Sequence, residues 1–113
     1  MKRIGELEKK YVNEELDGQF ASASGSKMTI RLEELFAEKF NLRYAISFVN
    51  GTATMHAALC ASESGPGDEV IVPPLTMSST AFAVLHANAI PVFADVDAQT
   101  FNIDPEDVKR KIT

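Results

Sequence analysis

Three short apolar runs dominate the second half of the chain. They cover residues 44–49, 69–72 and 91–96, and all three contain the β-branched or aromatic residues typical of strands. The segments between them, 52–62 and 77–87, are long enough to form helices. Because a helix usually connects two parallel strands, this pattern predicts an α/β fold with three parallel strands and right-handed crossovers.

The first 41 residues have a different pattern. Apolar residues recur there at helical spacing among charged ones, which predicts two amphipathic helices. The first helix would carry Ile4, Leu7, Tyr11 and Val12, and the second would carry Leu32, Leu35, Phe36 and Phe40. Residues 17–26 between them are small, polar and glycine-bearing, which predicts a loop. We therefore expect a single incomplete domain, with N-terminal helices and a loop over 1–41 and a βαβαβα portion over 42–113.

Turn and cap residues mark the ends of several elements. Residues 65–68, Gly-Pro-Gly-Asp, predict a turn before the second apolar run, and two prolines at 73 and 74 predict its end. Asp104 before Pro105, with acidic residues next, predicts the start of a last helix. Where strands and helices alternate, a helix is normally followed by another strand, so we expect the domain to continue beyond this chain.

Composition narrows the class of protein. The chain has 113 residues, of which 45% are hydrophobic, and its net charge of -5 disfavours nucleic acid and anionic membranes as general partners. Cys60 is the only cysteine, which excludes a disulfide framework, and its small apolar neighbours predict a place in the core. With no apolar run of roughly 20 residues and no signal-peptide pattern, we expect a cytoplasmic protein.

Asn50, Gly51 and Thr52 lie where the first apolar run gives way to a helix. Free backbone N–H groups and the positive helix end would point to one place there, and the threonine hydroxyl adds a donor. This junction predicts an anion site that suits a phosphate. The same pattern also occurs in turns that bind nothing, so both interpretations stay open.

Other polar residues give weaker signals. His56 and His86 lie within segments of small apolar residues, which favours packing or surface roles over acid–base catalysis. Asp95 and Asp97 would share a strand face, but no third ligand supports a metal site. Ligands of open α/β sheets bind beyond the carboxyl ends of strands, so we expect the loops 50–52, 73–77 and 95–97 to be neighbours.

Several motifs in order resemble one enzyme family. They are Asn-Gly-Thr-Ala-Thr at 50–54, Gly-Pro-Gly-Asp-Glu-Val-Ile-Val-Pro at 65–73, and Pro-Val-Phe-Ala-Asp-Val-Asp at 91–97 followed by Phe-Asn-Ile-Asp at 101–104. Together they resemble the DegT/DnrJ/EryC1/StrS aminotransferases, which are fold-type-I enzymes that use pyridoxal phosphate, mostly to aminate nucleotide-linked keto-sugars. The resemblance implies the N-terminal portion of the large domain of such an enzyme.

The resemblance also implies roles for four residues. Gly51 and Thr52 would hold the cofactor phosphate. Met77 stands where the family usually has an aromatic residue over the pyridine ring, and its sulfur could cover the ring with less area, although ordinary packing explains it equally well. Thr80 would be a hydrogen-bonding residue behind the cofactor or an ordinary helix residue.

The catalytic lysine and the acid that binds the pyridine nitrogen lie farther along in the family, and no lysine here has that context. We therefore expect this chain alone to be inactive, as the N-terminal piece of a homodimeric sugar aminotransferase that uses an amino-acid donor. Two alternatives remain. One is a stand-alone, non-catalytic α/β module that binds a phosphorylated ligand or a protein partner, and the other is a sugar dehydratase of the same family, in which histidine replaces the lysine.

Overall fold

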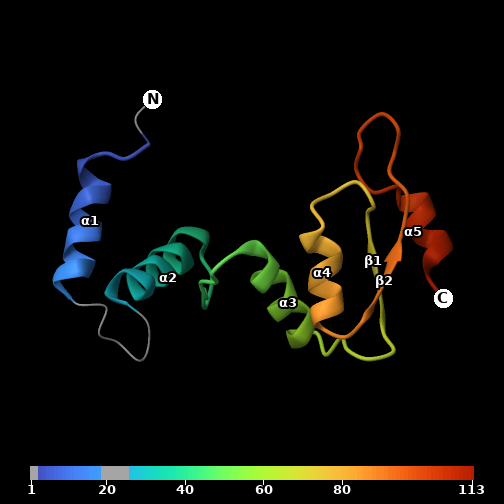
Figure 1. Ribbon diagram of the computed structural model, residues 1–113, viewed down its shortest axis with the longest axis horizontal. Coiled ribbons are helices and arrows are strands. Elements are labelled where there is room, and N and C mark those ends of the chain that lie inside the picture. Colours follow the sequence, from blue (N-terminus) through green and yellow to red (C-terminus); the bar gives the residue numbers. More distant parts are fainter. Residues whose placement is uncertain (1–2, 19–25) are drawn as a thin grey trace. The chain divides into compact units, whose positions relative to one another are not determined.

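The computed structural model describes residues 3–18 and 26–113 (Figure 1). The chain divides into two compact units, Met1–Ser47 and Phe48–Thr113, called unit 1 and unit 2 below. The predicted division of one domain after residue 41 stays a prediction.

Unit 1 contains the two expected amphipathic helices, α1 (Glu6–Asp17) and α2 (Lys27–Phe40), but Ile4, which was expected on the first helix, precedes α1. They contact each other, and the Arg31 guanidinium lies 4.6 Å from the ring centroid of Tyr11 while donating a hydrogen bond to its hydroxyl at 3.1 Å. The hydroxyl of Ser26 caps α2 by accepting the Thr29 N–H at 3.1 Å. Of the predicted loop over 17–26, residues 19–25 lie outside the described residues.

Unit 2 contains the α/β part of the chain (Figure 1). Its elements, in order, are α3 (Gly51–Ala61), β1 (Glu69–Val72), α4 (Ser79–His86), β2 (Ile90–Phe93) and α5 (Pro105–Lys111). The two strands are parallel, with Glu69 opposite Ile90 and Val72 opposite Phe93. A parallel pair with a helix between its strands confirms the predicted α/β class.

The prediction of a third strand over residues 44–49 is wrong for this structure. This segment has no regular secondary structure, and the described sheet has only the strands β1 and β2. A strand exists through pairing of its backbone groups, and the segment finds no neighbouring strand among the described residues. β2 is also shorter than predicted, because the backbone N–H of Asp95 donates to a carboxylate of α5 instead of to a strand.

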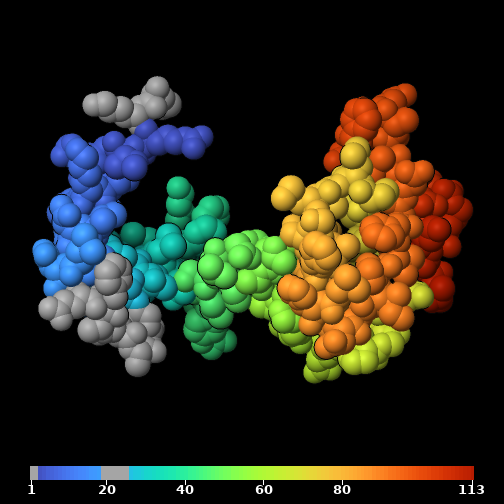
Figure 2. Space-filling model, viewed as in Figure 1, coloured from blue at the N-terminus to red at the C-terminus, as the bar shows by residue number. Residues whose placement is uncertain are grey.

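The core of unit 2 is small and lies where α4 contacts β1 and β2. Figure 2 shows the outer surface of this unit, in green to red. Val72, Val84 and Ala89 form its buried cluster, and Leu59 and Val70 pack against it. The predicted turn before β1 is present: the Asp68 N–H donates to the Gly65 carbonyl at 3.0 Å, and Gly67 has a φ of 95°, which favours glycine.

Cys60 corrects another expectation. It was predicted to lie in the core, but it is exposed, since small apolar neighbours along a helix do not determine which of its residues are covered. Among the helices in the described ranges, none combines the length and apolar character that crossing a membrane requires.

Candidate functional site

The turn before α3 has the geometry of a helix N-terminus with a built-in cap. Asn50 is the N-cap, and its side-chain oxygen accepts the Ala53 N–H at 2.9 Å. The Thr54 N–H begins the helical ladder by donating to the Asn50 carbonyl at 3.2 Å. The hydrogen bonds formed among the described residues do not involve the N–H groups of Gly51 and Thr52. Two amides of the turn therefore have no hydrogen-bond acceptor among the described residues, and Asn50 accepts the third.

The space beside this turn is open. A Cβ atom placed on Gly51 would meet no other heavy atom within 4 Å, so packing among the described residues does not explain the glycine. The N-terminus of an 11-residue helix also carries partial positive charge that favours an anion. Two amides, open space and the neighbouring Thr52 hydroxyl fit a phosphate group.

The other two predicted site residues lie in the loop after β1 and at the start of α4. Thr80 lies in the first turn of α4, where its hydroxyl is 3.3 Å from the hydroxyl of Thr76. It also lines a groove of about 400 Å³ formed by residues of α3, β1 and α4. Met77 is 75% exposed, so it packs little within the described residues. The structure therefore leaves Met77 accessible and gives Thr80 a hydrogen-bond partner, Thr76, in the loop that precedes α4.

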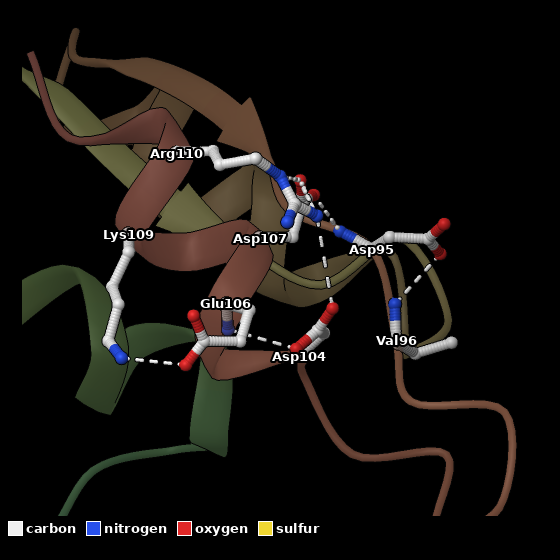
Figure 3. Close-up of polar contacts among 7 residues, drawn as sticks. All are labelled: Asp95, Val96, Asp104, Glu106, Asp107, Lys109 and Arg110. Carbon is white, nitrogen blue, oxygen red and sulfur yellow. Dashed lines mark hydrogen bonds and ion pairs between the residues drawn. The ribbon is translucent and has the colours of Figure 1, made fainter.

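The carboxylate of Asp107 on α5 binds the backbone shortly after the end of β2 (Figure 3). Asp107 accepts the backbone N–H of Asp95 at 2.6 Å and pairs with the Arg110 guanidinium at 2.9 Å. The Asp95 N–H is the main reason why the pKa of Asp107 lies below its ordinary value, and Arg110 lowers this pKa further. The Asp104 side chain caps α5 by accepting the Glu106 N–H at 2.9 Å, which confirms the predicted helix start.

Asp95 and Asp97 do not share a strand face, because β2 ends at Phe93. The Asp95 carboxylate accepts the Val96 N–H at 2.8 Å. The Asp97 carboxylate accepts the backbone N–H of Thr100 at 2.8 Å and its hydroxyl at 2.9 Å, and these donors lower the pKa of Asp97. Both side chains thus serve the turns of this loop.

Within the described residues, no hydrogen bond joins the turn 50–52 to the loops 73–77 or 95–97, and their expected proximity stays a prediction. The structure does bring His56 and His86 together, in an edge-to-face contact with ring centroids 5.8 Å apart, in line with a packing role. The sequence interpretation missed the cap made by Asn50 and the clamp made by Asp107. Asparagine before a helix was the available signal for the first, whereas no local signal indicated the second, because Asp107 and Asp95 are 12 positions apart.

Comparison with known proteins decides the family. The sequence profile of the DegT/DnrJ/EryC1/StrS aminotransferase family matches residues 2–113. The chain belongs to this family. A related protein, the GDP-perosamine synthase of Escherichia coli O157:H7, is 41% identical over 106 residues, which are 94% of this chain and 29% of that protein.

Solved structures agree with the membership in the DegT/DnrJ/EryC1/StrS family. The aminotransferase from Psychrobacter cryohalolentis superposes with a TM-score of 0.86 at 35% identity, over 97% of this chain and 28% of that one. The E. coli GDP-4-keto-6-deoxy-D-mannose-3-dehydratase, solved with bound hydrated pyridoxal phosphate (PLP), superposes with a TM-score of 0.83 at 26% identity, over 100% of this chain and 30% of that one. The chain thus spans less than a third of the length of these relatives.

Proposed function

We propose that this chain is the N-terminal piece of a PLP-dependent aminotransferase that transfers an amino group from an amino acid to a nucleotide-linked keto-sugar. The family match over residues 2–113 supports the aminotransferase class, and the similarity to a GDP-perosamine synthase supports a nucleotide-sugar substrate. The PLP bound in one structural neighbour supports the cofactor.

In this proposal, the chain supplies the binding turn for the cofactor phosphate. The observation that carries it is the pair of amides at Gly51 and Thr52, which form no hydrogen bond among the described residues and lie at the N-terminus of α3. The Thr52 hydroxyl would be a third donor, and the helix end would balance part of the negative charge. PLP bound there supplies the electron sink of the reaction, while the turn fixes one end of the molecule.

Two further residues have proposed roles near the cofactor. Met77 would cover one face of the pyridine ring, because it is exposed and its polarizable sulfur makes favourable contacts with aromatic rings. Thr80 would hold the loop after β1 in place through its contact with Thr76. Neither residue replaces the lysine that PLP chemistry requires, so we expect this chain alone not to transaminate. A cytoplasmic homodimer completes the proposal for the full-length enzyme.

Binding of pyridoxamine phosphate tests the phosphate turn, because this probe forms no imine with lysine side chains. We expect the chain to bind pyridoxamine phosphate more tightly than pyridoxamine, and Thr52→Val to weaken the phosphate-dependent part by about tenfold, since a hydrogen bond to a charged group contributes roughly 1.5–3 kcal/mol. Thr54→Val is the matched control, because the Thr54 hydroxyl donates to the Asn50 carbonyl inside the helix. Equal affinities for the two probes, or equal losses in both variants, would refute the assignment. Titration calorimetry provides the measurement.

A dehydratase of the same family is the second candidate, because the structural neighbour with bound PLP is a sugar dehydratase whose match covers 100% of this chain. The resemblance implies that the two activities differ at one position, which is a lysine in the aminotransferases and a histidine in the dehydratase. This position lies outside residues 1–113. Sequencing of the coding DNA after Thr113 distinguishes them: a lysine in that context supports the aminotransferase, and a histidine supports the dehydratase. A stand-alone binding module predicts instead that the chain is monomeric by sedimentation and melts cooperatively.

A further inference from the structure

Met77 is the most accessible of the methionines that the structure describes. It is 75% exposed, whereas Met28 and Met55 are half-buried. Met28 lies in the first turn of α2, and Met55 lines the groove formed by residues of α3, β1 and α4. Small solutes therefore reach the thioether of Met77 more freely than the thioethers of the other two.

The backbone at Met77 is held in place, although its side chain is exposed. The Thr80 N–H donates to the Met77 carbonyl at 3.0 Å, and the hydroxyls of Thr76 and Thr80 are 3.3 Å apart. The Phe82 N–H donates to the Ser78 carbonyl at 3.0 Å, so the residues on both sides of Met77 are joined to the first turn of α4. The exposed thioether thus belongs to a loop with defined contacts.

An exposed thioether reacts with hydrogen peroxide. The sulfur attacks one peroxide oxygen with an electron pair, the O–O bond breaks, and a sulfur–oxygen bond forms. The departing hydroxide takes the proton from the new sulfur-bound oxygen and leaves as water, so the methionine loses two electrons and the peroxide gains them. The product, methionine sulfoxide, is polar and chiral, and methionine sulfoxide reductases convert it back to methionine.

We propose that Met77 is a site of reversible oxidation by hydrogen peroxide, and that its sulfoxide weakens binding of the cofactor. This inference rests on the proposed function, in which Met77 covers one face of the pyridine ring. Oxidation replaces an apolar, polarizable sulfur with a polar S–O group, so the favourable contact between sulfur and ring is lost. A site that takes up its cofactor from solution is open before loading, and peroxide enters the same way.

Peroxide treatment followed by peptide mass spectrometry tests the site in the 113-residue chain. Cys60 is also exposed and thiols react with peroxide, so every sample carries Cys60→Ser. We expect Met77 to be oxidised at least about threefold faster than Met28 and Met55, because it is the most accessible of the three. We also expect pyridoxamine phosphate to slow the oxidation of Met77 and to leave that of Met28 unchanged. Similar rates for the three methionines, or no protection of Met77, would overturn the proposal.

Titration calorimetry with pyridoxamine phosphate measures the consequence of oxidation. We expect the oxidised chain to bind about threefold more weakly, and methionine sulfoxide reductases with a thiol reductant to restore the affinity. Met77→Leu has an apolar side chain without sulfur, so we expect its affinity to be the same before and after peroxide treatment. Met55→Leu, the matched control, retains Met77 and is expected to lose affinity as the parent chain does. An unchanged affinity after complete oxidation of Met77, or an equal loss in Met77→Leu, would contradict the proposed role.

Two separate measurements distinguish the role of Met77 from that of the phosphate turn. The oxidation rates without a probe concern Met77 alone, and the comparison of pyridoxamine phosphate with pyridoxamine concerns the turn at Gly51 and Thr52. Equal affinities for these two probes would refute the phosphate turn and the proposed oxidation switch with it. Tighter binding of pyridoxamine phosphate, together with similar oxidation of the three methionines, would refute only the role of Met77.

Discussion

The two units of the chain use apolar residues in different ways. In unit 2, α4 buries Ala83 and Val84 against β1 and β2. In unit 1, neither α1 nor α2 has a buried residue, although α2 is more amphipathic than α4 of unit 2. The helices of unit 1 are supported by local contacts, such as the Ser26 cap and the ion pair of Lys9 with Glu6 at 2.7 Å. The periodicity of apolar residues therefore predicts that a helix forms. Burial of its apolar face also requires another element that packs against that face.

The largest expected effect is the difference in stability between the same substitution made in unit 2 and in unit 1. Val84→Ala removes two methyl groups from a side chain that is 2% exposed, and we expect it to lower the free energy of unfolding of unit 2 by about 2 kcal/mol. Val12→Ala is the same change on α1, where the side chain is 58% exposed, and we expect a change below about 0.5 kcal/mol. Urea denaturation followed by circular dichroism measures both. Similar losses would mean that unit 1 is buried in solution and that the comparison fails.

The helix caps give an effect of intermediate size. Asn50→Ala removes the acceptor for the Ala53 N–H, and we expect α3 and unit 2 to lose about 1 kcal/mol together. Ser26→Ala removes the equivalent cap of α2, and we expect faster hydrogen exchange in the first turn of α2 without any change in unit 2. If Ser26→Ala also destabilised unit 2, the two units would be coupled more strongly than the division of the chain into two compact units indicates.

The smallest effect concerns two neighbouring acids on α5. Asp107→Asn keeps an oxygen that accepts the Asp95 N–H but loses its charge, so we expect a modest decrease in the urea midpoint of unit 2 at pH 7. Glu106→Gln, the control, affects only an exposed pair with Lys109, and we expect a smaller change.

Acid titration sharpens this test. The pKa of Asp107 is lower in the folded state than its ordinary value of 3.8, so the unfolded state binds the proton more readily. The contribution of Asp107 to stability is complete above pH 3.8 and is lost as the pH falls through the lower, folded value. We expect the midpoint of Asp107→Asn to depend less on pH in this acid range than that of the unsubstituted chain. Parallel curves for the two proteins would contradict the role of the charge.

Most of the fold of unit 2 could be predicted, because its signals are local. The bounds of β1 follow from the Gly-Pro-Gly-Asp turn and the following prolines, and the start of α5 follows from Asp104 and Pro105. Residues 44–49 were wrongly predicted as a strand of this structure because strand formation depends on a neighbour that the local pattern does not contain. Cys60 was wrongly predicted as buried for the same reason: small apolar neighbours do not determine which face of a helix is covered.

The candidate site also contains residues that the sequence indicates locally and residues that only the fold brings together. Gly51 and Thr52 could be singled out because a strand-like run, a glycine and a helix follow each other in the sequence. The Asp107 clamp on Asp95 could not, because its two residues are 12 positions apart and meet only when α5 folds back onto the end of β2.

Asn50 caps α3 with its own side chain and so satisfies a backbone amide before any ligand arrives. The helix therefore needs no anion to hold its first turn together, and an unloaded protein keeps the shape of the turn. If the proposed phosphate role of this turn is correct, binding and release of the ligand would require little reorganisation of the backbone, which suits a group that a protein takes up after synthesis rather than one around which it must fold.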